Sequence, residues 1–385
     1  MDTGRGPVVL VVSPNAGHTA DRDVLTHALR EAGVEVERVI DITTLDERTP
    51  QGQQWKDAGC GAAVAAGGDG TVGAVASHIA GSGLPLGILP VGTANDVARS
   101  LGIPLDVEAA CQVVAHGQAR AMDLGYARPG ETEPSALVEL ADGQRAGIHT
   151  PALERIAALA EAGAYFVHAA TLGLNVDFAR LATDATRRQR LGRLTYLASA
   201  IQALTHFHAV PITVRLEGVT AEAYGMGAPS EKVRRGESLN VEQVDSVRVI
   251  SGEVIQIAAV ITPVFGGPRN FRLQGVDVAD RVLDFVVIEA LETRHLKALV
   301  ERFEMLHATE SGEADANTAE SGVQTLDIPG IWRFQARAAR IIEPAELDVT
   351  LDGEIRARTP LDIWTAPAAL TVLVPQDGMG EQTGG

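Results

Sequence analysis

Two short glycine-rich stretches contain the residues of this sequence whose types and spacing are best suited to chemistry. GGDGT (residues 67–71) places Asp69 among three glycines, and GTAND (residues 92–96) ends in Asp96. Glycines let backbone N–H groups approach a phosphate closely, and a helix that begins just after such a loop adds its positive end. A carboxylate that faces a polyphosphate is repelled unless a cation or a hydroxyl group lies between them. Asp69 is therefore predicted to act through Mg²⁺ or a substrate hydroxyl.

The glycines of the first stretch also form a different pattern. Gly68, Gly70 and Gly73 make a G-x-G-x-x-G sequence, which is the fingerprint of dinucleotide-binding turns. That fingerprint requires an acidic residue about 20 positions further on to hold the ribose. No acidic residue lies between Asp69 and Asp96, which argues against a dinucleotide site. The absence of a G-K-[ST] sequence excludes a P-loop.

A purely structural interpretation is open for each stretch taken singly. GGDG is typical of tight turns, and GTAND predicts Thr93 as the N-cap of a helix, with Asp96 three residues later as in a capping box. The cap and a phosphate site are compatible, because both use a helix N-terminus. Two such stretches at neighbouring strand ends favour a binding site over two unrelated turns.

Alternating strands and helices are predicted for the N-terminal third. Residues 7–12 (PVVLVV), 62–66 (AAVAA) and 86–91 (LGILPV) are short apolar runs, as expected of strands covered on both faces. Apolar residues at helical spacing predict a helix from about Thr71. This alternation predicts an α/β domain with a doubly wound, mostly parallel sheet, in which ligands bind at the carboxyl ends of the strands. Both glycine-rich stretches fall at such ends.

The composition limits the class of protein. The 385 residues are enough for two domains, 45% of them are hydrophobic, and the net charge of −18 argues against nucleic-acid binding. There is no uninterrupted apolar run of about 18 residues, which a membrane span requires. The N-terminus has no basic region of the kind found in secretory signals, and Cys60 and Cys111 alone suggest no disulfide framework. We therefore expect a cytoplasmic protein; the sequence leaves a homodimer open.

Three longer segments, in order along the chain, resemble a known family. They are AAGGDGT (65–71), LGILPVGTANDVARSLGIP (86–104) and LDVTLDGEIRARTPLDIWTAPAALTVLVP (347–375). These segments are similar to the diacylglycerol kinase catalytic-domain family, which includes soluble bacterial lipid kinases and sphingosine and ceramide kinases. NAD kinases share the G-G-D-G-T loop, whereas the G-T-x-N-D-x-A-R segment resembles the lipid kinases.

The resemblance implies an ATP-dependent kinase that phosphorylates a hydroxyl group of diacylglycerol or a related lipid. ATP would lie in the cleft between the α/β domain and a β-rich second domain. Asp352 and Glu354 of the D-G-E motif would include the general base, and Asp69 and Asp96 complete the implied catalytic set. The nucleotide-binding residues that the resemblance implies are Ser13, Pro14, Asn15, Ala16, Gly17, Gly67, Gly68, Asp69, Gly70, Thr71 and Thr93.

The resemblance also implies two magnesium sites. Asp69, Asp96 and Asp123 would form an acidic network around the catalytic Mg²⁺, and Asp280 would belong to a structural Mg²⁺ site. Mg²⁺ prefers carboxylates together with water and phosphate oxygens, so these residue types suit the role.

The sequence departs from the family pattern at several positions. Gly73 and Ala74 stand where the family often has Asn-Glu, and Arg281 stands where the structural Mg²⁺ segment usually has glycine. These departures leave two alternatives open. One is a catalytically silent homologue that binds a nucleotide or a lipid, and the other is a kinase for NAD or another small molecule.

The resemblance predicts two domains. The nucleotide-binding domain is expected over residues 1–122, with about 360–385 returning to it, and the β-rich domain over 123–359. The segments 131–164 and 307–324 are predicted to be insertions.

A lipid substrate requires transient, peripheral contact with a membrane surface. Residues 187–196 (RRQRLGRLTY) are a basic cluster with interleaved apolar residues that could meet lipid headgroups. A solvated helix face explains the same cluster equally well.

Overall fold

The computed structural model describes residues 6–13, 21–46, 49–130, 163–173, 209–224, 239–265, 271–290 and 331–376. The helices are α1 (Arg22–Glu31), a short 3-10 helix (Ile42–Thr44), α2 (Gly52–Asp57), α3 (Asp69–Ile79), α4 (Asp96–Ser100) and α5 (Val107–His116). The strands are β1 (Val8–Val12), β2 (Val36–Asp41), β3 (Ala62–Gly67), β4 (Leu86–Pro90), β5 (Gln118–Pro129), β6 (Ala164–Phe166), β7 (Ala169–Gly173), β8 (Val210–Glu217), β9 (Ala221–Tyr224), β10 (Leu239–Val244), β11 (Val247–Val260), β12 (Val264–Phe265), β13 (Phe271–Arg272), β14 (Leu283–Glu289), β15 (Ile331–Ala336), β16 (Ala338–Glu343), β17 (Asp348–Leu351), β18 (Glu354–Arg358) and β19 (Leu361–Val374).

The N-terminal part is the predicted α/β domain. Strands β2, β1, β3 and β4 lie side by side in that order, and all three pairings are parallel. Every residue of β1, β3 and β4 is buried, as expected for central strands of a parallel sheet that is covered by helices. Helix α3 packs on β3 and β4, and α5 packs on β4. The structure thus confirms the expected fold class for this part.

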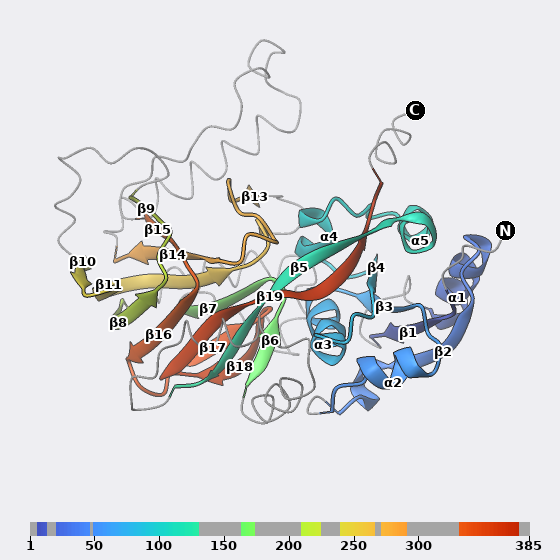
Figure 1. Ribbon diagram of the computed structural model, residues 1–385, viewed down its shortest axis with the longest axis horizontal. Coiled ribbons are helices and arrows are strands. Elements are labelled where there is room, and N and C mark those ends of the chain that lie inside the picture. Colours follow the sequence, from blue (N-terminus) through green and yellow to red (C-terminus); the bar gives the residue numbers. More distant parts are fainter. Residues whose placement is uncertain are drawn as a thin grey trace, which may run out of the picture.

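The C-terminal part is built from antiparallel strands. Its long central strand, β11, pairs with β7, β8, β10 and β14. Strand β17 pairs with β7 on one side and with β18 on the other, through a tight turn. Figure 1 shows this strand-rich part beside the α/β part, which confirms the expected β-rich second part.

Two long strands, β5 and β19, run through both parts (Figure 1). They pair with each other in antiparallel fashion along almost their whole length, and Val372 of β19 also pairs in parallel with Leu86 of β4. Their register shifts between Ala366 and Leu370, so a bulge separates the half of the ladder beside β4 from the half in the strand-rich part. Asp123, where the second domain was predicted to begin, lies in β5 opposite this bulge.

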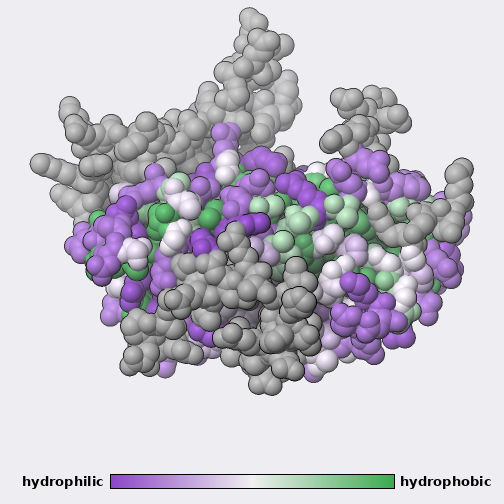
Figure 2. Space-filling view, viewed as in Figure 1, coloured by the Kyte–Doolittle hydropathy of each residue, from purple (hydrophilic) through white to green (hydrophobic). Residues whose placement is uncertain are grey.

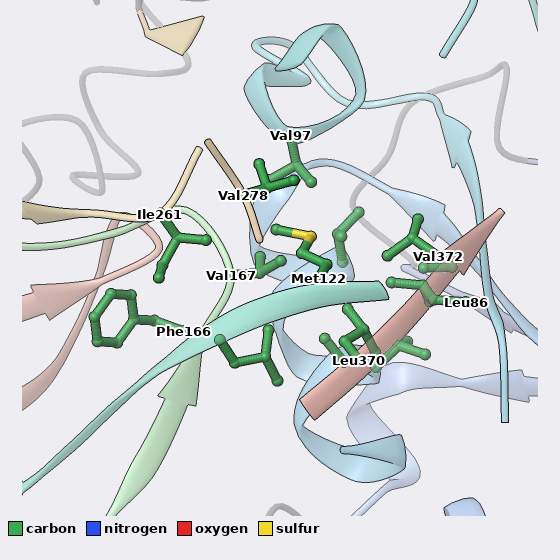
Figure 3. Close-up of a cluster of buried hydrophobic side chains, with 14 of the residues drawn as sticks. Leu86, Val97, Met122, Phe166, Val167, Ile261, Val278, Leu370 and Val372 are labelled. Atoms are coloured by element: carbon green, nitrogen blue, oxygen red, sulfur yellow. The ribbon is translucent and has the colours of Figure 1, made fainter. Parts of the chain in front are cut away.

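A continuous apolar core joins the two parts. Figure 3 shows Val97 of α4 and Met122 of β5 beside Val167, Ile261 and Val278 of the strand-rich part, and all five belong to the same buried cluster. Full burial of an aliphatic or aromatic side chain of this size contributes roughly 1.5–3 kcal/mol relative to exposure. Packing therefore holds the ends of the two parts together at the place where the motif residues gather.

The face of the molecule seen in Figure 2 carries both polar and apolar residues. Figure 2 shows hydrophilic residues at both ends of the view and patches of apolar residues between them. Among the described residues there is no helix long and apolar enough to span a bilayer. The basic cluster at 187–196, residues 14–17, the segment 307–324 and most of the segment 131–164 lie outside the described residues.

Candidate active site

The two glycine-rich stretches lie against each other at the carboxyl ends of neighbouring strands. GGDGT follows β3 and opens α3, and GTAND follows β4 and opens α4. A Cβ placed on Gly92 would collide with the backbone of Gly68, whose N atom would be only 2.8 Å away. Glycine is therefore required at Gly92 because two backbone segments touch there. The sequence correctly predicted that these two stretches meet at one edge of the sheet.

Asp69 connects the two stretches through a hydrogen bond. It is the first residue of α3, and its Oδ1 accepts a hydrogen bond from the backbone N–H of Val97 in the first turn of α4 at 2.9 Å. The carboxylate is only half-buried. Asp69 is thus the first residue of α3 and also accepts a hydrogen bond from an N–H group at the start of α4, which has no partner within that helix.

The predicted N-cap of α4 at Thr93 is wrong. The N-cap is Asn95, which adopts a left-handed conformation with φ 56°. Its side-chain amide donates to the carbonyl groups of Pro90 and Gly92 at 3.1 and 2.9 Å, and its Oδ1 accepts from the N–H of Gly92 at 3.0 Å. Asparagine both tolerates this φ and has the donors and acceptor that close the loop, whereas a β-branched threonine does not. Thr93 is left exposed at the loop surface.

Other predicted nucleotide-binding residues surround this edge of the sheet. The N–H of Ser13, at the end of β1, donates to the carbonyl of Ala66 in β3 at 3.2 Å, which brings the start of the first loop beside GGDGT. Thr71 is buried and packs against Gly67 so closely that a Cβ on Gly67 would collide with it. Pro14, Asn15, Ala16 and Gly17 fall outside the described residues.

The D-G-E motif forms the tight turn between β17 and β18. Asp352 and Gly353 have φ values of 51° and 85°, as a two-residue hairpin turn with both central residues left-handed requires. The carboxylate of Asp352 is buried, and its Oδ1 accepts hydrogen bonds from the N–H groups of Val167, His168 and Ala169 at 3.2, 2.8 and 3.2 Å. The N–H of Val167 also lies 3.0 Å from Oδ2. Asp352 therefore locks the turn onto the segment between β6 and β7.

Burial dominates the electrostatics of Asp352. Desolvation raises the pKa of its carboxyl to about 7, and the negative charge of Asp69 adds to the rise, while the three N–H donors oppose it. The influence of Asp69 on this pKa also indicates that the D-G-E turn and the GGDGT loop are neighbours.

The D-G-E turn contacts α3 directly. Oε1 of Glu354 lies 3.2 Å from the place that a Cβ on Gly70 would occupy. Oδ2 of Asp352 lies against Gly73, where an added Cβ would collide with it. Unlike Asp352, Glu354 is exposed. The structure therefore brings Asp352 and Glu354 to the start of α3 beside Asp69, from which they are more than 280 positions distant in the sequence.

His168 is a site residue that the sequence did not indicate. Its Nδ1 lies 2.5 Å from the hydroxyl of Thr262, and its ring packs on Phe265 at 4.5 Å between centroids. Burial lowers the pKa of His168, and the charge of Asp69 opposes this. The imidazole is therefore beside the GGDGT loop and favours the neutral form. A lone histidine has no distinguishing spacing, so nothing in the pattern of residue types identified it.

Asp123 lies in different surroundings from Asp69. It is buried, and its two oxygens accept hydrogen bonds from the N–H groups of Ala368 and Arg281 at 2.7 and 2.6 Å. Ala368 and Arg281 both have positive φ values. Desolvation raises the pKa of Asp123, and the carboxylate of Asp277 adds to the rise. Its contacts therefore join β5 to the bulge of β19 and to the loop before β14.

Asp280 belongs to the same surroundings as Asp123. Its Oδ1 accepts from the N–H of Val282 at 3.1 Å. Desolvation raises its pKa to about 6, and Asp284, Asp277 and Asp123 add to the rise. These charges associate Asp123 with Asp280.

Asp96 is buried at the start of α4, where its carbonyl oxygen accepts from the hydroxyl of Ser100 at 2.7 Å. The Ser100 hydroxyl in turn accepts from the N–H of Val264 at 3.0 Å, which ties α4 to β12. Among the described residues, no three His, Cys, Asp or Glu side chains come close enough together to hold a metal ion.

The residues around the start of α3 nevertheless suit a phosphate-bound Mg²⁺. Asp69 precedes Gly70 in the chain and the carboxylate of Glu354 lies over that glycine, so carboxylate oxygens from two elements border one loop. Mg²⁺ is commonly held by one or two carboxylates, with water and substrate phosphates completing the shell. A protein cage of three side chains is not required for such an ion.

Comparison with known proteins confirms the resemblance seen in the motifs. Residues 7–127 match the model of the diacylglycerol kinase catalytic domain. A protein named diacylglycerol kinase from Mycobacterium tuberculosis is 24% identical over 381 residues, which is 97% of this chain and 96% of that protein. The chain is therefore similar to the diacylglycerol kinase catalytic domain over residues 7–127, and to a protein named diacylglycerol kinase over most of its length.

Other relatives match only a part of the chain. A probable lipid kinase, YegS-like, from Yersinia enterocolitica is 38% identical over 112 residues, or 27% of this chain and 36% of that protein. An uncharacterized protein from Synechocystis is 47% identical over 60 residues, which is 14% of its length.

A crystal structure of a diacylglycerol kinase from Bacillus anthracis has the same fold. It aligns with a TM-score of 0.59 at 16% identity and covers 98% of this chain and 99% of that one. At this identity, the likeness shows the architecture alone.

Proposed function

We propose that this protein is an ATP- and Mg²⁺-dependent lipid kinase that transfers a phosphoryl group to a hydroxyl of diacylglycerol or a related lipid. The single observation that carries the proposal is the position of Glu354 of the D-G-E turn over Gly70 of the GGDGT loop. This position puts an exposed carboxylate beside the loop whose backbone is suited to phosphate.

The nucleotide phosphates are proposed to bind at the loop of residues 67–71. The amides at the start of α3 point toward such a ligand, and the helix N-terminus favours its negative charge. Asp69 is held in place by its bond to Val97 and is the residue best placed to hold Mg²⁺, with Asp96 beside it on α4. Held by Asp69, a bound Mg²⁺ would supply positive charge that neutralises the transferring phosphate.

Glu354 is proposed as the general base. A lipid alcohol is a weak acid, and a carboxylate within hydrogen-bond reach accepts its proton as the oxygen attacks phosphorus. The new bond joins the alcohol oxygen to the γ-phosphorus, the bond from that phosphorus to the bridging oxygen breaks, and ADP leaves. Asp352 is unsuited to this step, because its carboxylate is buried and bound to three backbone N–H groups. We assign it the role of holding Glu354.

We propose that Asp123 and Asp280 support the fold beside the site and do not ligate the catalytic ion. Their contacts, described above, run to β19 and to the loop before β14. A lipid acceptor further requires a peripheral, transient encounter with a membrane surface. We retain the basic cluster at 187–196 as the candidate for that contact.

The proposal is tested by transfer of ³²P from labelled ATP to diacylglycerol, ceramide, sphingosine and NAD in parallel, with and without Mg²⁺. Labelled phospholipid that forms only with Mg²⁺ supports it. Labelled NAD phosphate would instead identify a small-molecule kinase. Tight ATP binding without transfer to any acceptor would favour a silent homologue.

A further inference from the structure

Gly73 occupies an unusual place for a glycine. It lies inside α3, four residues after Asp69, and its φ is not in the left-handed region. Glycine weakens a helix interior, because it loses more backbone freedom on folding than alanine does. Nothing in the conformation of α3 therefore requires a glycine at this position, and the reason for it must lie in what approaches the helix.

The group that approaches is the carboxylate of Asp352. A Cβ on Gly73 would collide with Oδ2 of Asp352 and would lie 3.2 Å from its Cγ. The carboxylate has little freedom to retreat, since its oxygens accept hydrogen bonds from the N–H groups of Val167, His168 and Ala169. In addition, the N–H of Asp352 donates to the carbonyl of Ala169 at 2.9 Å.

Gly70 makes a matching contact one turn earlier. Gly70 and Gly73 are three residues apart and so lie on the same face of α3. Glu354 lies over the first and Asp352 over the second. The two acidic residues of the D-G-E turn thus lie along the face of α3 that carries Gly70 and Gly73. Because both belong to one tight turn, a shift of Asp352 also moves Glu354.

We infer that Gly73 sets the position of the D-G-E turn: the missing side chain admits Asp352 against α3, and this fit places Glu354 over Gly70. Gly73 is therefore a positioning residue that acts through Asp352. The catalytic consequence rests on the proposed function, but the fit between Gly73 and Asp352 does not.

The test is a double-mutant cycle of Gly73→Ala and Asp352→Gly. Glycine at 352 removes the carboxylate and keeps the positive φ of the turn. We expect Gly73→Ala to lower the urea midpoint of unfolding of the wild-type protein, because the new methyl group displaces Asp352. In the Asp352→Gly background the same change should raise the midpoint, because the carboxylate is gone and alanine is the better helix former. Ala74→Ser adds one heavy atom in the same turn of α3 and serves as the matched control.

Two further measurements locate the effect. Deuterium exchange of the amides at 167–169 should be faster in Gly73→Ala than in the wild type, and unchanged in Ala74→Ser. With an active enzyme, Gly73→Ala should lower kcat at least tenfold while the KM for ATP stays within about twofold, since the GGDGT loop is intact.

The outcomes separate the two hypotheses. A Gly73→Ala change that raises the midpoint equally in both backgrounds, or that lowers it as much in the Asp352→Gly background as in the wild type, overturns the inference. Unchanged exchange at 167–169 overturns it as well. If wild-type protein phosphorylates no acceptor, the proposed function fails, and the unfolding and exchange data still decide the role of Gly73.

Discussion

Asp352 and Asp123 are both buried carboxylates held by backbone N–H groups, yet their neighbours differ. Asp352 lies against α3 and is followed, two residues later, by the exposed Glu354 over the GGDGT loop. Asp123 lies at the bulge between β5 and β19, and its charged neighbours are Arg281 and Asp277. A buried aspartate that accepts hydrogen bonds from backbone N–H groups thus occurs in two different surroundings. The residue type alone does not show which surroundings an aspartate will have. Their surroundings predict that the first region controls catalysis and the second controls stability.

The largest effect is expected for Glu354→Gln. Removal of a general base typically costs 10²- to 10⁴-fold in rate, so transfer should fall by about that factor. The side chain is exposed, so the melting temperature and the affinity for ATP should change little. Steady-state kinetics with labelled ATP measure the transfer rate and the KM for ATP, and thermal unfolding measures the melting temperature. Full activity in Glu354→Gln would remove this residue from the mechanism.

Asp123→Asn should have the opposite profile. One of the two N–H donors, from Ala368 or Arg281, would then face an NH₂ group, and a buried donor left without an acceptor costs about 1–3 kcal/mol. We expect a lower free energy of unfolding and an unchanged Mg²⁺ dependence of the rate. Urea unfolding and a magnesium titration of the rate check this. A raised magnesium requirement with unchanged stability would return Asp123 to the catalytic network.

The pH dependence of stability should single out Asp352. Its pKa rises from 3.8 to about 7 on folding, so the native state binds this proton more tightly than the unfolded chain. The resulting stabilisation is complete below about pH 4 and is lost as the pH rises to about 7, by at most about 1.4 kcal/mol per pKa unit. Asp123, Asp280 and Asp284 have raised pKa values and contribute with the same sign.

Asp352→Asn isolates the contribution of this carboxyl group. The variant should show a shallower decline in urea midpoint between pH 4 and pH 8 than the wild type, whatever its absolute stability. Parallel slopes for the two proteins would show that Asp352 titrates normally.

The smallest effect on phosphoryl transfer itself is expected at the basic cluster. If residues 187–196 meet anionic headgroups, each arginine near the surface contributes about 1 kcal/mol to binding. Replacing Arg187, Arg188 and Arg190 with Glu should reduce flotation with anionic liposomes and leave transfer to a short-chain soluble diacylglycerol unchanged. Undiminished flotation would count against an interfacial role for the cluster.

Local patterns predicted much of the α/β part. Continuous apolar runs identified β1, β3 and β4, and helical spacing identified α3, which begins at Asp69 rather than near Thr71. The aspartate and glycine of D-G-E suit the turn between β17 and β18, since both residue types tolerate positive φ. These features depend on neighbours in the chain, and a sequence records such neighbours directly.

Features that depend on contacts between side chains far apart in the sequence could not be predicted from local patterns. Gly73 was noted as a departure that removes a polar side chain, whereas the structure shows that Asp352 fills the space above it. Gly70 and Gly73 belong to the dinucleotide-like G-x-G-x-x-G pattern, but both are contacted by the D-G-E turn. The roles of Asn95 and His168 likewise depend on groups that only the folded chain brings near.

The most direct test of the central claim is a crystal structure of the protein with Mg²⁺ and a non-hydrolysable ATP analogue. We expect the triphosphate to lie against the amides of residues 68–70, with a Mg²⁺ ion at Asp69 and the carboxylate of Glu354 facing the γ-phosphate. A triphosphate bound away from this loop, or a Glu354 carboxylate turned away from it, would rule out the proposed active site.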